Sequence, residues 1–222
     1  MSFWRFLLGC LRIVTKGGRV YYSSIFFLFV LIVWGAIGYF DQLQNGLIVT
    51  NMRDSVSWGF YIGNFTFLVG VAAAAVMLVI PAYIYNWKQL KEIVIFGEIL
   101  AIVAVIMCLG FITVDIGKPL HFWHMLPFVG TINFPSSVLA WDFFVLLIYF
   151  ILNLIIVAHL LYKHFYKKEY NKSFILPLVL FSIPAAIAIH TVTAFLFNAI
   201  PARPYWNSAL LAPRFLTTAF CS

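Results

Sequence analysis

Apolar residues run through this chain in five long blocks, separated by short polar segments that hold most of the charge. An α-helix needs about 20 mostly apolar residues to cross a bilayer. The five blocks reach that length, and they lie roughly at residues 21–40, 57–85, 93–114, 137–162 and 174–197. We therefore predict an all-α, polytopic transmembrane helix bundle with five full spans. Within it, Gly59, Gly63 and Gly70 predict close packing of the second span against its neighbours.

A sixth helix is predicted to begin near Pro213, because proline suits the first turn of a helix. Residues 210–222 would extend for about 20 Å, whereas the hydrocarbon core is about 30 Å thick. From this pattern we expect the sequence to stop inside a span, as the product of a truncated or split gene, or a fragment, would.

The composition is that of a membrane protein, with 64% hydrophobic and 9% charged residues. These values exclude a soluble globular domain. The net charge of +7 requires no nucleic-acid partner, because the lipid bilayer itself accounts for a basic protein of this kind.

Lysine and arginine gather in alternate loops, which predicts the orientation. Ten of the fourteen lie in the N-terminal arm and in the second and fourth loops: Arg5, Arg12, Lys16, Arg19, Lys88, Lys91, Lys163, Lys167, Lys168 and Lys172. Such residues stay in the cytoplasm during insertion. We therefore predict a multi-pass protein of the cytoplasmic (inner) membrane with its N-terminus inside.

The same pattern predicts four segments. Residues 1–20 form an interfacial arm that contains an amphipathic helix, and residues 21–40 form a peripheral first transmembrane helix. Residues 57–197 form a four-helix bundle that carries the functional site. Residues 198–222 form an outer loop and the start of the sixth helix.

Ionisable residues gather toward the predicted outer ends of the spans, where a charge is costly and often marks a site. They are Asp115, Lys118, His121, His124, Asp142, His190, Arg203 and Arg214. Asp115 with Lys118 also fits a loop salt bridge or a helix cap, and His121 fits an ordinary interfacial histidine. His124 and Asp142 border apolar sequence, which favours a functional pair.

Glu98 lies near the opposite, inner end of its span. Its side chain could reach the cytoplasmic surface, pair with Lys88 or Lys91, or belong with Asp115 to a proton path. These alternatives stay open from the sequence.

The cysteines predict no redox metal within this chain. Cys10, Cys108 and Cys221 are isolated, which excludes local iron–sulfur and c-haem motifs. His159 and His190 lie roughly 20 Å apart in depth, so they cannot share a haem. A His124–His190 pair is geometrically possible, but His124 lies close to a loop. Any redox metal is expected in a partner.

Histidine and aspartate near one membrane face suit quinol oxidation. That reaction releases two protons with two electrons, and histidine titrates near neutral pH. Aromatic side chains such as Trp123 and Trp141 could hold the quinone ring, and the electrons would then leave to an external cofactor.

Four sequence motifs resemble the NrfD/PsrC family of quinone-reactive integral membrane subunits. They are Trp58-Gly59-Phe60-Tyr61-Ile62-Gly63, Val114-Asp115-Ile116-Gly117-Lys118-Pro119, Phe122-Trp123-His124, and the run from Ala202-Arg203-Pro204-Tyr205-Trp206-Asn207 to Leu211-Ala212-Pro213-Arg214-Phe215-Leu216. Trp141-Asp142-Phe143 and the Pro213 region look most like the ten-helix branch, which includes DsrP, the Hmc membrane subunit and subunits of alternative complex III.

The resemblance implies an exchangeable menaquinone and no intrinsic haem or iron–sulfur cluster. It also implies a ferredoxin-like iron–sulfur subunit on the outer, periplasmic face, and other membrane subunits, among them a b-type cytochrome. A DsrMKJOP-like complex of sulfur metabolism in anaerobic respiration is the expected setting. The family has two four-helix bundles side by side, whereas this chain has one.

By position, the family's quinone-site histidine and neighbouring acid would be His124 and Asp142. The remaining expected site residues are His121, Trp123, Trp141, His190 and Arg203 around the quinone, and Asp115 and Glu98 on the proton path. Two other functions stay open: a proton or ion transporter, and a purely structural membrane anchor. Substrate uptake without quinone would favour the first, and silent His124 and Asp142 substitutions the second.

Overall fold

The computed structural model describes residues 2–53, 56, 58–85, 87–91, 93–125, 129–130, 133–200 and 203–219. The described elements are helical: α1 (Ser2–Val14), α2 (Arg19–Asn45), η1 (Leu47–Thr50), α3 (Phe60–Val79), η2 (Ile80–Ile84), α4 (Lys88–Lys91), α5 (Val94–Asp115), η3 (Pro119–Met125), α6 (Val138–Phe165), α7 (Lys172–Asn198), η4 (Pro204–Trp206) and α8 (Leu211–Ala219). Among these residues, five helices are long and apolar enough to span a membrane. The predicted all-α, five-span fold is confirmed.

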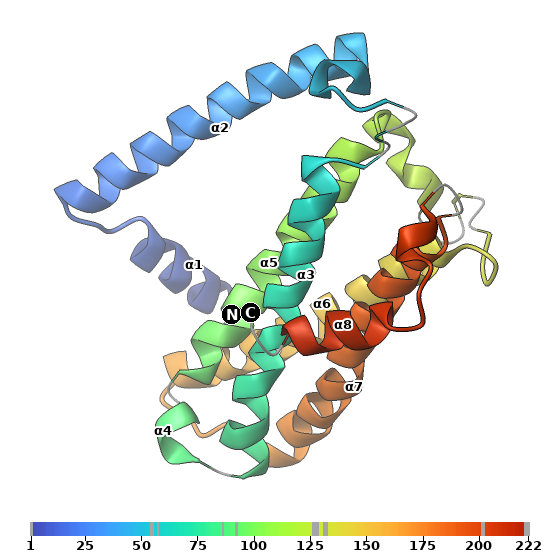
Figure 1. Ribbon diagram of the computed structural model, residues 1–222. Coiled ribbons are helices and arrows are strands. Elements are labelled where there is room, and N and C mark those ends of the chain that lie inside the picture. Colours follow the sequence, from blue (N-terminus) through green and yellow to red (C-terminus); the bar gives the residue numbers. More distant parts are fainter. Residues whose placement is uncertain are drawn as a thin grey trace.

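Four of the long helices close into a ring (Figure 1). α3 packs against α5 and α7, and α6 packs against the same two helices from the other side. The core between them combines large side chains, such as Phe65 and Leu146, with a row of alanines, such as Ala72 and Ala104. Small residues let helix backbones approach where lipid gives no hydrophobic driving force. α8 lies on α7 and α3.

The short helices and loops define the two ends of this ring. The η3–η4 end holds the starts of α3 and α6 and the ends of α5 and α7, together with η3 and η4. The opposite α1 end holds η2, α4 and the end of α6, on which α1 packs through Phe6. The Phe6 ring contacts Tyr162 and Phe165 edge-on, with centroids 5.5 and 5.6 Å away.

A buried tyrosine ties two helices across the core. The Tyr149 hydroxyl on α6 donates a 2.7 Å hydrogen bond to the Ala72 carbonyl on α3. Asn153 donates in turn to the Tyr149 carbonyl. Buried polar groups in a membrane must find partners within the protein. The bond from Tyr149 to Ala72 joins α6 to α3, and the bond from Asn153 lies within α6.

The prolines affect α3 and α7 differently. After Pro81, which lacks a backbone N–H, α3 widens into the π-helical turn η2, in which the Tyr85 N–H bonds to the Ile80 carbonyl. Pro184 lies inside α7, yet α7 continues through it from Lys172 to Asn198.

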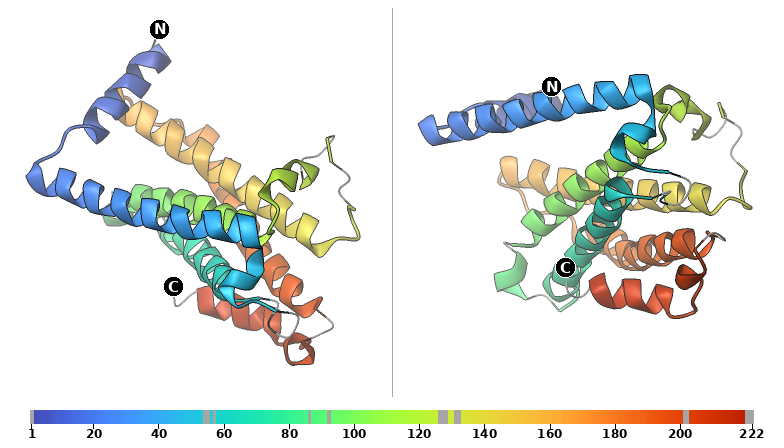
Figure 2. Two further views of the ribbon diagram at one scale, coloured as in Figure 1. Left: turned by 90° about the horizontal axis from the view of Figure 1, so that it is seen from above. Right: turned by 45° about the horizontal axis from the view of Figure 1, so that its top comes forward.

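α2 stands apart from the ring along most of its length (Figures 1 and 2). Gln42 is its buried residue; the other side chains of α2, all of which is described, are half-buried or exposed. The Gln42 amide donates to the Val114 carbonyl of α5 at 2.9 Å and accepts from the Tyr61 hydroxyl of α3 at 2.7 Å. One glutamine therefore ties the η3–η4 end of α2 to two ring helices.

Replacing Gln42 with leucine is expected to release this end of α2. The change removes two hydrogen bonds and leaves a carbonyl and a hydroxyl without their partner, at a cost of about 1–3 kcal/mol. Spin labels attached to cysteines that replace Gly38 and Gly110, in a chain without its native cysteines, should then show a broader distribution of the distance between the two labels. Gln44→Leu, two residues along on exposed α2 surface, should leave it unchanged. A narrow distribution in Gln42→Leu would contradict the assigned tie.

Candidate functional site

A cavity of about 440 Å³ opens near the η3–η4 end, between α3, α7, η4 and α8. We call it the His190 cavity, after the buried histidine in its wall. Its lining residues are Gly63, Thr66, Phe67, Gly70, His190, Tyr205, Trp206, Leu211, Arg214, Phe215 and Thr218.

The cavity exists because one face of α3 carries small residues. Gly63, Thr66 and Gly70 follow at three- and four-residue spacing, so they lie on one side of the helix. A Cβ added to Gly63 would meet no atom within 4 Å. The expectation that Gly63 serves close helix packing is therefore wrong, because its missing side chain leaves open space.

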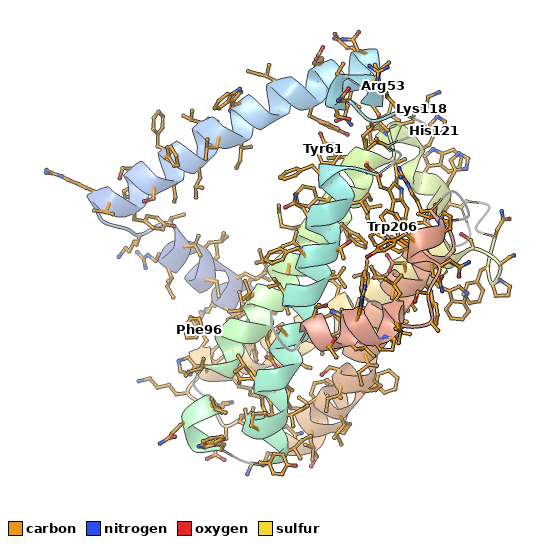
Figure 3. The ribbon with its side chains drawn as sticks, viewed as in Figure 1. Arg53, Tyr61, Phe96, Lys118, His121 and Trp206 are labelled. Atoms are coloured by element: carbon orange, nitrogen blue, oxygen red, sulfur yellow. The ribbon has the colours of Figure 1, made fainter. Side chains whose placement is uncertain are left out.

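An aromatic cluster covers the cavity toward the η3–η4 end. Trp58, before α3, stacks on Trp206 of η4 with ring centroids 5.9 Å apart. Phe197 of α7 packs edge-on against both tryptophans, at 4.9 and 5.1 Å. Phe197 also contacts Phe215 of α8 at 5.6 Å. Trp206 is labelled in Figure 3, where it lies beside the ends of α3 and α7. Trp206 and Phe215 line the cavity and make this part of its wall apolar, and Trp58 and Phe197 pack against them.

His190 supplies a polar group in the cavity wall. Only 2% of the surface of His190 is exposed, and its Nδ1 atom has no hydrogen-bond partner among the described residues. A buried polar atom without a partner is uncommon and calls for a ligand or a functional role. Arg214 of α8 lines the same cavity and is exposed, so it adds a positive charge at the opening.

Asp142 lies in the core next to the same part of α7. Its side chain is fully buried, and Oδ1 accepts a 2.6 Å hydrogen bond from the Thr193 hydroxyl. Its Oδ2 atom has no partner among the described residues. Thr193 follows His190 by three residues, hence one helical turn away on the same side of α7. The structure therefore relates Asp142 to His190 through α7.

His124 occupies a different place. It lies in η3, is exposed, and stacks on Trp123 with ring centroids 3.8 Å apart; His121, also exposed, lies 5.5 Å from it. A Cβ added to Gly130 would overlap the His124 carbonyl, so glycine is needed where the two backbones meet. Asp142 takes its hydrogen bond from Thr193 and not from His124. The predicted pairing of His124 with Asp142 stays a prediction.

A second cavity, of about 560 Å³, lies on another side of α7, and Trp141 is in its wall. Its lining residues are Val138, Trp141, Val192, Phe195, Asn198, Ala199 and Asn207. The sequence grouped Trp141 with His190, whereas the structure places them in separate cavities. Arg203 directly precedes η4 and is half-buried.

The structure contradicts one of the alternatives that the sequence left open for Glu98. It is fully buried in α5, and neither carboxylate oxygen has a partner among the described residues. The interpretation that it reaches the membrane surface is therefore wrong. The side chains of Lys88 and Lys91, its other proposed partners, lie outside the described part of the chain. Asp115 ends α5 half-buried, at the η3–η4 end.

Sequence reasoning placed Arg214 among the clustered ionisable residues but did not assign most of the cavity wall to a site, including Gly63, Thr66, Trp206 and Phe215. A signal was present in the helical spacing of Gly63, Thr66 and Gly70. This spacing indicated that one face of the helix has small side chains. It did not show whether another helix or a ligand fills the space beside that face.

The family described as "Polysulphide reductase, NrfD" matches residues 48–222 of this chain. The chain belongs to this family. It is thus a multi-pass integral membrane protein, as its five spans also indicate. The C subunit of selenate reductase from Mesobacillus selenatarsenatis is 24% identical to it over 92% of this chain and 54% of that protein.

Two further relatives have names that bear on function. The Hdr-like menaquinol oxidoreductase integral membrane subunit of Archaeoglobus fulgidus is 24% identical over 93% of this chain and 49% of that protein. The C polypeptide of polysulfide reductase from Wolinella succinogenes is 28% identical over 74% of this chain and 55% of that protein. The chain spans about half the length of the curated relatives it matches.

Proposed function

We propose that this NrfD-family chain is a quinone-reactive membrane subunit, which exchanges electrons between menaquinol and an iron–sulfur partner at the η3–η4 end. One observation carries the proposal: His190, whose buried Nδ1 atom has no hydrogen-bond partner among the described residues, lies in the wall of a cavity that aromatic side chains also line. The name of the Archaeoglobus relative includes menaquinol, which supports the choice of substrate.

The cavity suits a quinone head group. Its volume of about 440 Å³ falls in the range of small-molecule sites, about 300–1,000 Å³. Trp206 and Phe215 offer ring faces for stacking, and Arg214 can donate a hydrogen bond to a quinone carbonyl. The open space beside Gly63 lets a flat ring approach the α3 backbone.

His190 is placed to accept a proton from the bound quinol. Oxidation of a quinol to a quinone releases two electrons and two protons, and a base must hydrogen-bond the hydroxyl that loses its proton. We assign the acceptance of this hydrogen bond to the imidazole of His190, which lines the cavity. Asp142, one helical turn away through Thr193, is a second acceptor beside the site. An iron–sulfur cluster of the proposed partner would accept the two electrons.

The remaining expectations belong to this proposal. Glu98 and Asp115 have buried carboxylate oxygens without a partner among the described residues, and we assign these two groups to proton transfer. Arg53, Lys118 and His121 gather at the η3–η4 end, where they offer a polar surface to the partner (Figure 3). The ten-helix branch, the periplasmic side of that end and a complex of sulfur metabolism stay predictions.

A photoreactive menaquinone analogue tests the site directly. Labelling that free menaquinone competes away is expected within 60–79 and 211–219, which line the His190 cavity. Competed labelling confined to η3, at His121 and His124, would instead place the quinone where the sequence predicted it. The absence of any competed labelling would overturn the proposal and favour transport or anchoring.

A further inference from the structure

A second polar pocket, unrelated to the His190 cavity, lies at the α1 end of the ring. It has a volume of about 150 Å³ and lies between η2, the start of α5 and the end of α6. We call it the basic pocket. Its lining residues are Tyr83, Ile95, Leu160, Lys163, His164, Lys168, Glu169 and Tyr170.

The turn that ends α6 brings two lysines into this pocket. Lys167 takes a left-handed conformation, with φ of 53°, and the Lys168 N–H bonds back to the Lys163 carbonyl at 2.9 Å. This bond reverses the chain, so that residues five apart face the same pocket. Lysines are favourable here because the end of a helix carries partial negative charge.

The two ammonium groups are available to a ligand. Neither Lys163 nor Lys168 forms an ion pair within the described part of the chain. Glu169 also lines the pocket, and its carboxylate repels an anion. The two lysines outweigh this charge, so the pocket carries one net positive charge when His164 is not counted. Tyr83 and Tyr170, with ring centroids 6.3 Å apart, add two hydroxyl donors.

An apolar track leads from the pocket along α5. Ile95 in the pocket wall is followed by Ile99, Ile102 and Ile106, at the spacing of one helix face. All four are at least partly exposed, and Ile106 is 51% exposed. Phe96, labelled in Figure 3, extends this apolar surface at the same end. A ligand with a charged head and a hydrocarbon tail fits both parts together.

The neighbouring α1 points to the same ligand class. Arg5 and Arg12 are exposed, as are Trp4 and Leu8, so α1 shows basic and apolar side chains together. Such a helix lies in the membrane interface and is drawn to anionic lipid. Because α1 packs on the end of α6, whose Lys163 and His164 line the pocket, we place the pocket near the lipid head groups.

We propose that the basic pocket binds the phosphodiester head group of an anionic phospholipid, with Lys163 and Lys168 on the phosphate and an acyl chain along the isoleucines of α5. Basic pockets between transmembrane helices are suited to such head groups. The site is independent of quinone chemistry, because it lies at the other end of the ring.

Native mass spectrometry of the full chain, with added phosphatidylglycerol or phosphatidylcholine of equal acyl length, tests the proposal. Phosphatidylglycerol should bind more tightly. The Lys163→Gln/Lys168→Gln variant should weaken it by roughly fivefold for each lysine. Lys16→Gln/Lys172→Gln, which removes two exposed lysines outside the pocket, should bind like the unsubstituted chain.

Glu169→Gln provides a gain that misfolding cannot imitate, because loss of the opposing carboxylate should tighten phosphatidylglycerol binding. Equal losses in the two double variants would show diffuse surface attraction and overturn the site. So would unchanged binding in Lys163→Gln/Lys168→Gln. Displacement of the lipid by millimolar inorganic phosphate would show a free-anion site in place of a lipid site.

Discussion

His190→Gln is expected to lower menaquinol oxidation roughly 100-fold, the effect of losing one general base. Glutamine has similar bulk and can still hydrogen-bond a quinone, but it cannot take up a proton. Binding of a quinone analogue should therefore change by only a few-fold, whereas kcat falls. The measurement is steady-state oxidation of a menaquinol analogue by the chain assembled with its partner subunits.

The matched control for this prediction is His159→Gln on α6. His159 also has a buried, unpartnered nitrogen among the described residues, but it packs against Phe174 and lies outside the His190 cavity. It should retain activity. If His190→Gln keeps full kcat while His124→Gln loses it, the proton acceptor is the η3 histidine and the assignment to His190 fails.

Gly63→Leu is expected to abolish quinone binding by filling the His190 cavity. The space around an ideal Cβ position on Gly63 is empty to at least 4 Å, so a leucine can enter without displacing the helix backbone. The protein should fold, and burial of the new side chain should not destabilise it. Equilibrium binding of a menaquinone analogue should weaken by at least roughly tenfold, since the ring and the leucine compete for one volume.

Two leucine substitutions separate this effect from general perturbation. Ala199→Leu fills the second cavity, in whose wall Ala199 lies, and Gly110→Leu adds the same side chain to exposed α5 surface. Both should bind quinone normally. Loss of binding in Ala199→Leu, with normal binding in Gly63→Leu, would move the quinone to the cavity beside Trp141.

The transmembrane spans were predictable because their signal is local. A bilayer demands about 20 apolar residues in a row, and the helices follow the five apolar blocks with shifts of a few residues at their ends. α2 runs to Asn45, past the predicted end at 40, because Gln42 finds hydrogen-bond partners on α3 and α5. Those partners are distant in sequence, so no local pattern shows them.

The site was less predictable because it depends on how helices rotate about their axes. His124 and His190 both come close to the η3–η4 end when residues are counted along the chain. Packing then exposes His124 on η3 and turns His190 toward the open face of α3. The same limit applies to Glu98, whose burial follows from the contact of α5 with its neighbours rather than from its position along the span.

The hydrogen bonds of Gln42 have a consequence for how the protein is made. α2 buries little of its surface against the ring, so it can partition into lipid as soon as it leaves the ribosome. Its hydrogen-bond partners, Tyr61 and the Val114 carbonyl, are synthesised later. The attachment of α2 is therefore completed only when α5 has entered the bilayer and the Val114 carbonyl is available to Gln42. A nascent polypeptide arrested before Val114 would present α2 to other membrane proteins in that interval.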